Sequence, residues 1–464
     1  MNFQKKYLLN EKVFYSIVAF FFTLSILNSI YQFHKFNNFK VSLEGIENHS
    51  LINGDIKDFW DEGDKIIEEL KNGKNYFETG GEYRRPYLPS RTYAFFSSIL
   101  NMNLNDHLGK VSLDTKKIYL LFFQSIVFYF FLIILYKKIC LIFPKINCQI
   151  VILFLSIEPT LFMYHSSFWS ESIFFSLQLL LIIFILKKNL DFLNLILIGL
   201  ILGILYLQRS VAIFYILPVL IFYFFLKKEK FLKILIFITL GYLSIHFFVG
   251  YHNYVRMGQF YSTSTQAKDG FYEYLVPSVL SKKFDISRVE AKSKLQNQKQ
   301  KWIQVNNLDI KKESDRLKVY SYQSNQALQI IIKNPLHSIP IIFKKTVHFI
   351  ILDPVTHVYH FHKWNPKDGD YYKSKQHKKW IIPRIIYSLL IYFFCAFGIQ
   401  SFLNDKKNRL FLIYISLSIL YFTAVQSWYG GTRYFSPIII YLSFFFAHGI
   451  SFFLDKLRLK KSGI

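Results

Sequence analysis

The chain has 464 residues, of which 52% are hydrophobic and 19% aromatic, and its formal net charge is +26. Runs of about 20 nearly uncharged residues recur along most of it, and each is long enough to cross a bilayer, so a soluble globular protein is excluded. The positive charge does not indicate a nucleic-acid partner, because much of the lysine lies in short pairs at the ends of these runs, where it sets orientation and meets membrane lipids.

The apolar runs predict an all-α polytopic membrane protein with about ten transmembrane helices, forming a single membrane domain over residues 1–464. The first run follows three lysines and is too long for the core of a signal peptide, so we expect it to anchor the chain. In chain order, the predicted spans are 13–33, 118–136, 148–166, 170–186, 192–208, 211–226, 231–250, 381–403, 409–427 and 434–454.

The short basic connections predict the orientation of these spans. The connections near 137–138, 187–188, 227–230 and 406–409 are lysine-rich, as are both termini. If ten spans alternate, all of these segments fall on one side of the membrane, which the positive-inside rule identifies as the cytoplasm. The remaining connections then face outward.

Two of the outward connections are long. The first outer loop, residues 34–117, is expected to hold two interfacial helices near 55–73 and 92–100, with irregular backbone around the glycines and prolines between them. The large outer loop, residues 251–380, is expected to hold soluble helices within 281–325. It should also hold an interfacial helix near 335–352, because two lysines and two prolines make that segment a poor membrane crossing.

Asp55 and Asp58 open the first helix of the outer loop and are candidates for a general base that faces an outward cavity. The alternative for Asp55 is an ordinary helix cap that interacts with the helix dipole. The other acids of this helix are expected to form a solvated face. They are Asp61, Glu62 and Asp64.

Glu158 and Glu171 flank the outer turn within IEPTLFMYHSSFWSES. A carboxylate at the end of a span is costly in lipid and usually faces a cavity, an ion path or a partner. Glu171 is therefore a second catalytic candidate, although an acid at the start of a helix in an aqueous turn would look the same.

Four arginines lie in segments predicted to face outward: Arg84, Arg85, Arg209 and Arg433. The planar guanidinium group suits bidentate phosphate binding better than lysine does, and phosphate at the outer interface indicates a lipid phosphate. The alternative is that these arginines anchor the protein to phospholipid headgroups. Carboxylates on the same face favour a reaction that has a base and a leaving phosphate.

The stretch HVYHFHKW carries His357, His360 and His362, which are weak candidates for binding a divalent metal. Their spacing does not place all three on one face of a helix or a strand. The sequence therefore establishes no cofactor: a divalent metal is one interpretation of these residues, and interfacial histidines among aromatics are the alternative.

Six segments of the chain, in this order, resemble the GT-C superfamily of integral-membrane glycosyltransferases. Within it, the chain resembles the bacterial dolichyl-phosphate-mannose–protein mannosyltransferase and aminoarabinose transferase group, which is glycosyltransferase family 39-like. The segments are GDIKDFWDEGDKIIEELKNGKNYF, RRPYLPSRTYAFFSSIL, EPTLFMYHSSFWSESIFF, GLILGILYLQRSVAIFYILP, KNPLHSIPIIFKK and GGTRYFSPIIIYL.

The resemblance implies roles for four residues. Asp55 would match the catalytic carboxylate, Arg85 the basic residue near the lipid phosphate, Glu171 the acid of the second outer loop, and Arg433 the late arginine of the cavity.

The chain departs from the family pattern in two respects. Phe59 stands where tyrosine is common, and the first acid follows the first span by an unusually long segment. The base is therefore either Asp55 or Asp58.

The implied function is transfer of a sugar from a polyprenyl-phosphate-linked donor to an envelope glycan, lipid or protein. The reaction would take place on the outer, periplasmic face of the cytoplasmic (inner) membrane of a bacterium and invert the anomeric centre. One alternative is an O-antigen polymerase or ligase, which the early acidic helix disfavours. The other is a flippase or transporter of lipid-linked sugars, which two similar halves would favour and the sequence lacks.

Overall fold

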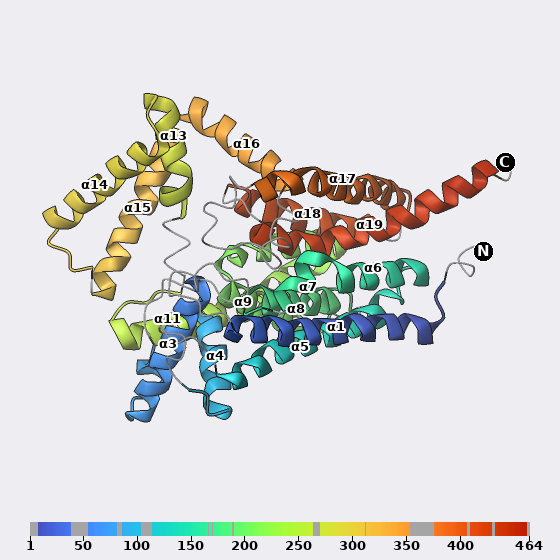
Figure 1. Cartoon of the computed structure of the whole chain (residues 1–464), viewed down its shortest axis with the longest axis horizontal. Coiled ribbons are helices and arrows are strands. Elements are labelled where there is room, and N and C mark those ends of the chain that lie inside the picture. Colours follow the sequence, from blue (N-terminus) through green and yellow to red (C-terminus); the bar gives the residue numbers. More distant parts are fainter. Residues whose placement is uncertain are drawn as a thin grey trace.

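In the computed structural model, the described residues are 8–38, 54–80, 86–103, 114–165, 167–168, 170–187, 190–262, 270–310, 312–352, 375–405, 409–428 and 432–461. All regular secondary structure in these ranges is helical, which confirms the predicted all-α membrane fold. Most helices run side by side in one elongated bundle, and a smaller group of helices stands at one end of it (Figure 1).

Each of the ten predicted spans corresponds to a helix, or to two consecutive helices, of the bundle. These are α1 (Glu11–Asn38), α5 (Ile118–Ile139), α6 (Lys145–Ile157) with α7 (Pro159–His165), α8 (Ser170–Ile185), α9 (Phe192–Gln208), α10 (Ile216–Leu226), α11 (Phe231–Met257), α17 (Lys375–Asn404), α18 (Arg409–Gln426) and α19 (Thr432–Lys461). The start of α1 and the end of α19 lie at the same end of the bundle, opposite the smaller group of helices (Figure 1).

Length and composition support fewer crossings than ten. Six helices in the described ranges are long and apolar enough to cross a membrane, and the pair α6 and α7, bent by 56°, would make a seventh. The expected single span 148–166 is thus broken next to Glu158. The helices α8 and α9 have 16 and 17 residues, so each is about 24–26 Å long and falls short of a bilayer core of about 30 Å.

Glycine allows two of these helices to pack with their backbones in contact. A Cβ atom on Gly199 of α9 would lie 2.2 Å from the backbone oxygen of Ile238 in α11, and one on Gly241 would lie 2.3 Å from the oxygen of Ile196. Such close approach is the usual role of small residues spaced four apart in membrane helices. It holds the middle of α9 firmly against α11.

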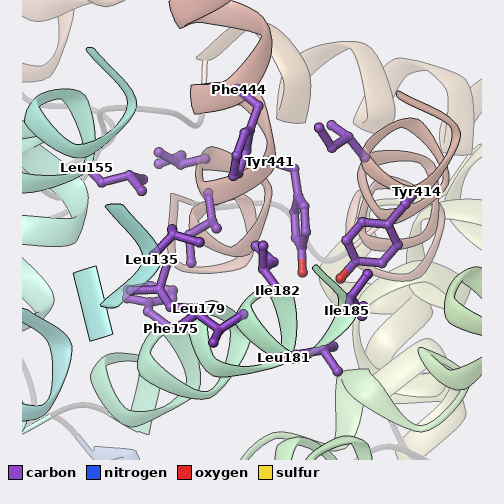
Figure 2. Close-up of a cluster of buried hydrophobic side chains, with 14 of the residues drawn as sticks. Leu135, Leu155, Phe175, Leu179, Leu181, Ile182, Ile185, Tyr414, Tyr441 and Phe444 are labelled. Atoms are coloured by element: carbon purple, nitrogen blue, oxygen red, sulfur yellow. The ribbon is translucent and has the colours of Figure 1, made fainter. Parts of the chain in front are cut away.

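The centre of the bundle holds a small polar network within an otherwise apolar core (Figure 2). The hydroxyl of Tyr215 contacts the hydroxyls of Tyr414 and Ser418, each at 3.0 Å, and also that of Tyr441. These residues come from three segments that are far apart in the sequence. Buried hydroxyls that bond to one another fix the alignment of the helices that carry them.

The first outer segment contains the amphipathic helix α3 (Gly54–Lys71), the short η1 (Tyr76–Glu78), α4 (Tyr87–Ile99) and η2 (Thr115–Lys117). The helix α4 begins five residues earlier than the sequence pattern predicts. Pro86 precedes its first residue and Pro89 lies in its first turn, where a missing N–H costs no hydrogen bond. The two prolines therefore lie at the start of the helix, where the sequence predicts irregular backbone.

The smaller group of helices comes from the large outer loop. Its members are η5 (Phe271–Leu275), α13 (Val276–Phe284), α14 (Arg288–Val305), α15 (Glu313–Lys333) and α16 (Pro335–Leu352). In Figure 1, α13, α14 and α15 form a separate cluster, and α16 leads from it back to the bundle. Tyr272, Val276, Leu295 and Ala327 form the buried core of this cluster.

Candidate functional site

Glu171 and Arg209 form an ion pair inside the protein, at the start of α8 and the end of α9. The Oε1 atom of Glu171 lies 3.4 Å from Nη2 of Arg209, and their side chains are 0% and 5% exposed. Ser170 Oγ donates to Oε2 of Glu171 at 3.1 Å, and Gln208 Nε2 donates to the backbone oxygen of Ser170 at 2.7 Å. The residues next to the pair therefore tie the two helix ends together.

Aromatic rings flank the Arg209 guanidinium group. Its Cζ atom lies 5.5 Å from the ring centroid of Phe174 and 5.7 Å from that of Tyr434. Tyr434 belongs to the first turn of α19 and follows Arg433 directly. Two predicted outer segments, at 209 and 433, thus meet at one place in the fold. The pair therefore lies where the ends of α8 and α9 meet the start of α19.

A second buried charged cluster lies between α3, α4 and α11. Nη1 of Arg91 lies 3.5 Å from Oε1 of Glu62, and its guanidinium group stacks on the Tyr87 ring at 3.6 Å. Arg256 Nη1 donates to the backbone oxygen of Gly80 at 2.9 Å. Burial raises the pKa of Glu62 to about 7, although the nearby charges of Arg91 and Arg256 act to lower it.

This second cluster corrects one sequence expectation. The acids of α3 were expected to be solvated, yet Glu62 and Asp64 are both buried. The helical period could have revealed Glu62, because it lies three residues after Phe59 and four before Ile66 and so shares their face. Arg91 was not among the predicted site residues either.

Gly80 connects this cluster to the segment that carries Arg84 and Arg85. Its φ of +106° belongs to the left-handed region, and its N–H donates to Oε2 of Glu69 at 2.8 Å. A Cβ atom at this position would lie 2.8 Å from Nη2 of Arg91. Backbone and side chain are therefore closely fitted at residue 80, just before the arginine segment.

A groove of about 990 Å³ runs between α3, α4, α5 and α8. Its walls are mainly apolar, and Phe123, Val127 and Phe131 form one stripe of it along α5 because they are four residues apart. Arg91 and Lys71 contribute charged groups to the same lining. The groove therefore combines an apolar channel beside membrane helices with cationic groups from the outer helices.

The contacts of Glu158 indicate a structural role for this buried carboxylate. Its Oε2 atom accepts from the backbone N–H of Leu161 at 2.8 Å, as a cap for α7, and its Oε1 atom accepts from the Tyr387 hydroxyl at 3.0 Å. The carboxylate thus stabilises the break between α6 and α7 and joins it to α17.

The other predicted site residues divide into two groups. Asp55 and Asp58 lie in the first turns of α3 and Arg433 in the first turn of α19, but the side chains of Asp55 and Arg433 lie outside the described residues. Arg84, Arg85, His357, His360 and His362 lie entirely outside them. Within the described ranges, no three acidic, histidine or cysteine side chains are grouped so that they could hold a metal.

No known family profile matches the sequence, and no curated protein matches it. Similarity is found among solved structures. The archaeal oligosaccharyltransferase AglB from Archaeoglobus fulgidus, in complex with an inhibitory peptide and a dolichol-phosphate, matches 99% of this chain at 13% identity with a TM-score of 0.52. The apo form of the oligosaccharyltransferase from that organism matches 96% at 12% identity with a TM-score of 0.49.

The chain spans about half the length of the archaeal protein, 52% in the first comparison. At this identity the likeness shows the fold. The predicted likeness to membrane glycosyltransferases is therefore confirmed for the arrangement of the helices, whereas the family 39-like subgroup stays a prediction.

Proposed function

We propose that this chain is a GT-C-type membrane glycosyltransferase that transfers a sugar from a polyprenyl-phosphate-linked donor to an envelope acceptor. The observation that carries the proposal is the 990 Å³ groove, because it joins an apolar wall along two membrane helices to the Arg91 guanidinium group. A polyprenyl phosphate has this same composition, with a long apolar chain and an anionic head. The archaeal protein of similar fold was solved with a dolichol-phosphate, which agrees with this reading.

The proposed reaction needs one general base and several cationic side chains. Asp55 or Asp58 takes the proton of the acceptor hydroxyl while its oxygen attacks the anomeric carbon. The bond from that carbon to the phosphate oxygen breaks, and the electron pair leaves on the polyprenyl phosphate. Arg84, Arg85 and Arg433 are proposed to stabilise the growing charge of that phosphate. A single displacement of this kind inverts the anomeric centre.

The buried pair has a supporting role in this proposal. Arg209 is held by Glu171 and lies 5.7 Å from the ring of Tyr434, so it fixes the start of α19 and with it the backbone of Arg433. We place the reaction on the outer face of a bacterial cytoplasmic membrane, since the basic connections assign the opposite side to the cytoplasm.

The test is release of polyprenyl phosphate, with water as the acceptor, from a panel of polyprenyl-phosphate monosaccharides by the purified chain in nanodiscs. Asp55→Asn or Asp58→Asn should abolish release, because the amide keeps the shape but takes no proton. Glu68→Gln, an exposed acid of the same helix, is the matched control and should leave release unchanged. If both aspartate variants turn over normally, neither residue is the base.

Arg85 separates phosphate binding from membrane anchoring. A guanidinium group makes two parallel bonds to phosphate where an ammonium makes a point contact. Loss of a charge-assisted contact of about 1.5–3 kcal/mol predicts a roughly tenfold to hundredfold weaker use of donor in Arg85→Ala. Arg85→Lys should fall between it and the unmodified chain. If all three share one donor dependence, the arginine is an anchor.

A further inference from the structure

A second cavity lies away from the groove, where the outer helices meet the end of α11. It has a volume of about 660 Å³ and is lined by residues 259–261, which follow α11, and by parts of α14 and α15. In Figure 1 the turn between α14 and α15 lies at the same end of the molecule as the end of α11. Its volume is within the range of small-molecule sites, roughly 300–1,000 Å³.

Two aromatic rings that stack on each other line this cavity. Trp302 of α14 and Tyr322 of α15 stack with their ring centroids 4.4 Å apart and their planes within 12° of each other. Phe260 adds a third ring to the lining and is 58% exposed. The stacked pair is half-buried, so the exposed ring of Phe260 supplies the free aromatic surface, which suits ligands with flat C–H faces such as pyranose rings.

Besides the aromatic rings, two leucines and one lysine, the lining consists of uncharged polar side chains. Carboxamide groups offer both donors and acceptors, so they match hydroxyl groups, which also donate and accept. A sugar carries several such hydroxyls around its ring edge. The carboxamides come from Gln259, Asn306, Asn325 and Gln326.

Few charged side chains line the cavity, although the chain has a net charge of +26. This indicates that the ligand is uncharged. Among the described residues that line the cavity, Lys318 is the sole charged one, and its Nζ atom lies 2.9 Å from Oδ1 of Asp315. Elsewhere α14 is rich in lysine. A cavity shaped for a phosphate or an acidic peptide would have cations directed into it.

We infer that the cavity formed by residues 259–261, α14 and α15 is a binding site for an uncharged glycan chain. The role of this glycan rests on the proposed function: in a glycosyltransferase, the bound glycan would be the acceptor or a part of it. A peptide is the less favoured occupant. An extended peptide usually pairs with the edge of a sheet, and the described part of the outer loop is helical.

The experiment is a titration of the full chain in nanodiscs with neutral hexose oligosaccharides of three to six units, followed by intrinsic fluorescence and calorimetry. Binding should be saturable, and Trp302→Ala and Asn325→Ala should each weaken it about tenfold. Val305→Ala is the matched control, since Val305 is exposed on α14 and lies outside the lining. Asn325 is exposed, so its variant tests the site even if loss of Trp302 disturbs the helix pair.

Three results would overturn the inference: no binding of any neutral oligosaccharide, an affinity of both the Trp302 and Asn325 variants equal to that of the unmodified chain, or saturable binding of uncharged peptides in place of glycans. Release of polyprenyl phosphate with water as the acceptor is measured on the same samples. Binding without release would leave the glycan site standing and remove the proposed donor chemistry, and release without binding would do the reverse.

Discussion

Glu171 and Arg209 face each other across 3.4 Å in the interior of the protein, although 38 positions separate them in the chain. Loss of one partner from a buried ion pair costs about 3–5 kcal/mol, mainly because a charge stays behind without its counterion. Glu171→Gln and Arg209→Gln should therefore each lower the melting temperature strongly. The double variant leaves neither charge, so it should lose less than the sum. Thermal unfolding of the four proteins in detergent measures this, and strictly additive losses would show that the charges do not interact.

Gly80 can be tested against Gly73, because both have positive φ angles, +106° and +83°. Alanine at either position should cost about 1 kcal/mol of stability through backbone strain. At Gly80 the new Cβ would also meet the Arg91 guanidinium group, whereas at Gly73 it would meet nothing within 4 Å. Because Arg91 lines the groove proposed for the donor, we expect slower release of polyprenyl phosphate from Gly80→Ala alone. A matching loss in Gly73→Ala would mean that strain, and not Arg91, is responsible.

The groove can be filled from α5. Val127 lines it, while the neighbouring Ile126 is exposed and lies outside the lining. Val127→Trp should occupy the space of the polyprenyl chain and raise the apparent KM for donor at least tenfold. Ile126→Trp adds the same side chain on the outside and should keep the KM unchanged. Kinetics in nanodiscs at varied donor concentration distinguish the two, and equal KM values would place the lipid chain elsewhere.

Glu62 predicts a dependence of stability on pH. Its pKa rises from 4.5 to about 7 on folding, so between these values the folded chain binds the proton that the unfolded chain has released. Stability should therefore fall as pH rises from about 5 to 8, by up to about 3 kcal/mol. Glu62→Gln has no proton to lose at this position and should show a flatter profile. Parallel melting-temperature curves for the two proteins over that range would contradict this.

The sequence predicts the helices of the bundle but not their breaks, exact starts or contacts. Hydropathy located each of the ten helical segments, because every one carries an apolar run. It missed the 56° break at Glu158, where the run continues but the backbone changes direction. It also placed the start of α4 too late, because Pro86 and Pro89 read as irregular backbone when they in fact lie at a helix start.

For the candidate site, too, the sequence indicates single residues but not the contacts between them. Glu171 and Arg209 could be identified one by one from their positions at span ends, but their contact depends on how α8 and α9 pack. Residue type predicts a solvated Glu62, because other acids flank it, whereas its spacing from Phe59 and Ile66 indicates the buried face. The cavity around Trp302 is formed by α14, α15 and the end of α11, and no local sequence pattern predicts that these segments lie together.

The position of the outer helices in the chain has an evolutionary consequence. The lining of the cavity proposed to bind a glycan comes from the stretch 259–326, whereas the lining of the groove comes entirely from residues 66–177. A single recombination event could therefore exchange the whole cavity and leave the groove intact. Under the proposed function, descendants of such an event would keep one lipid-linked donor while the acceptor changed.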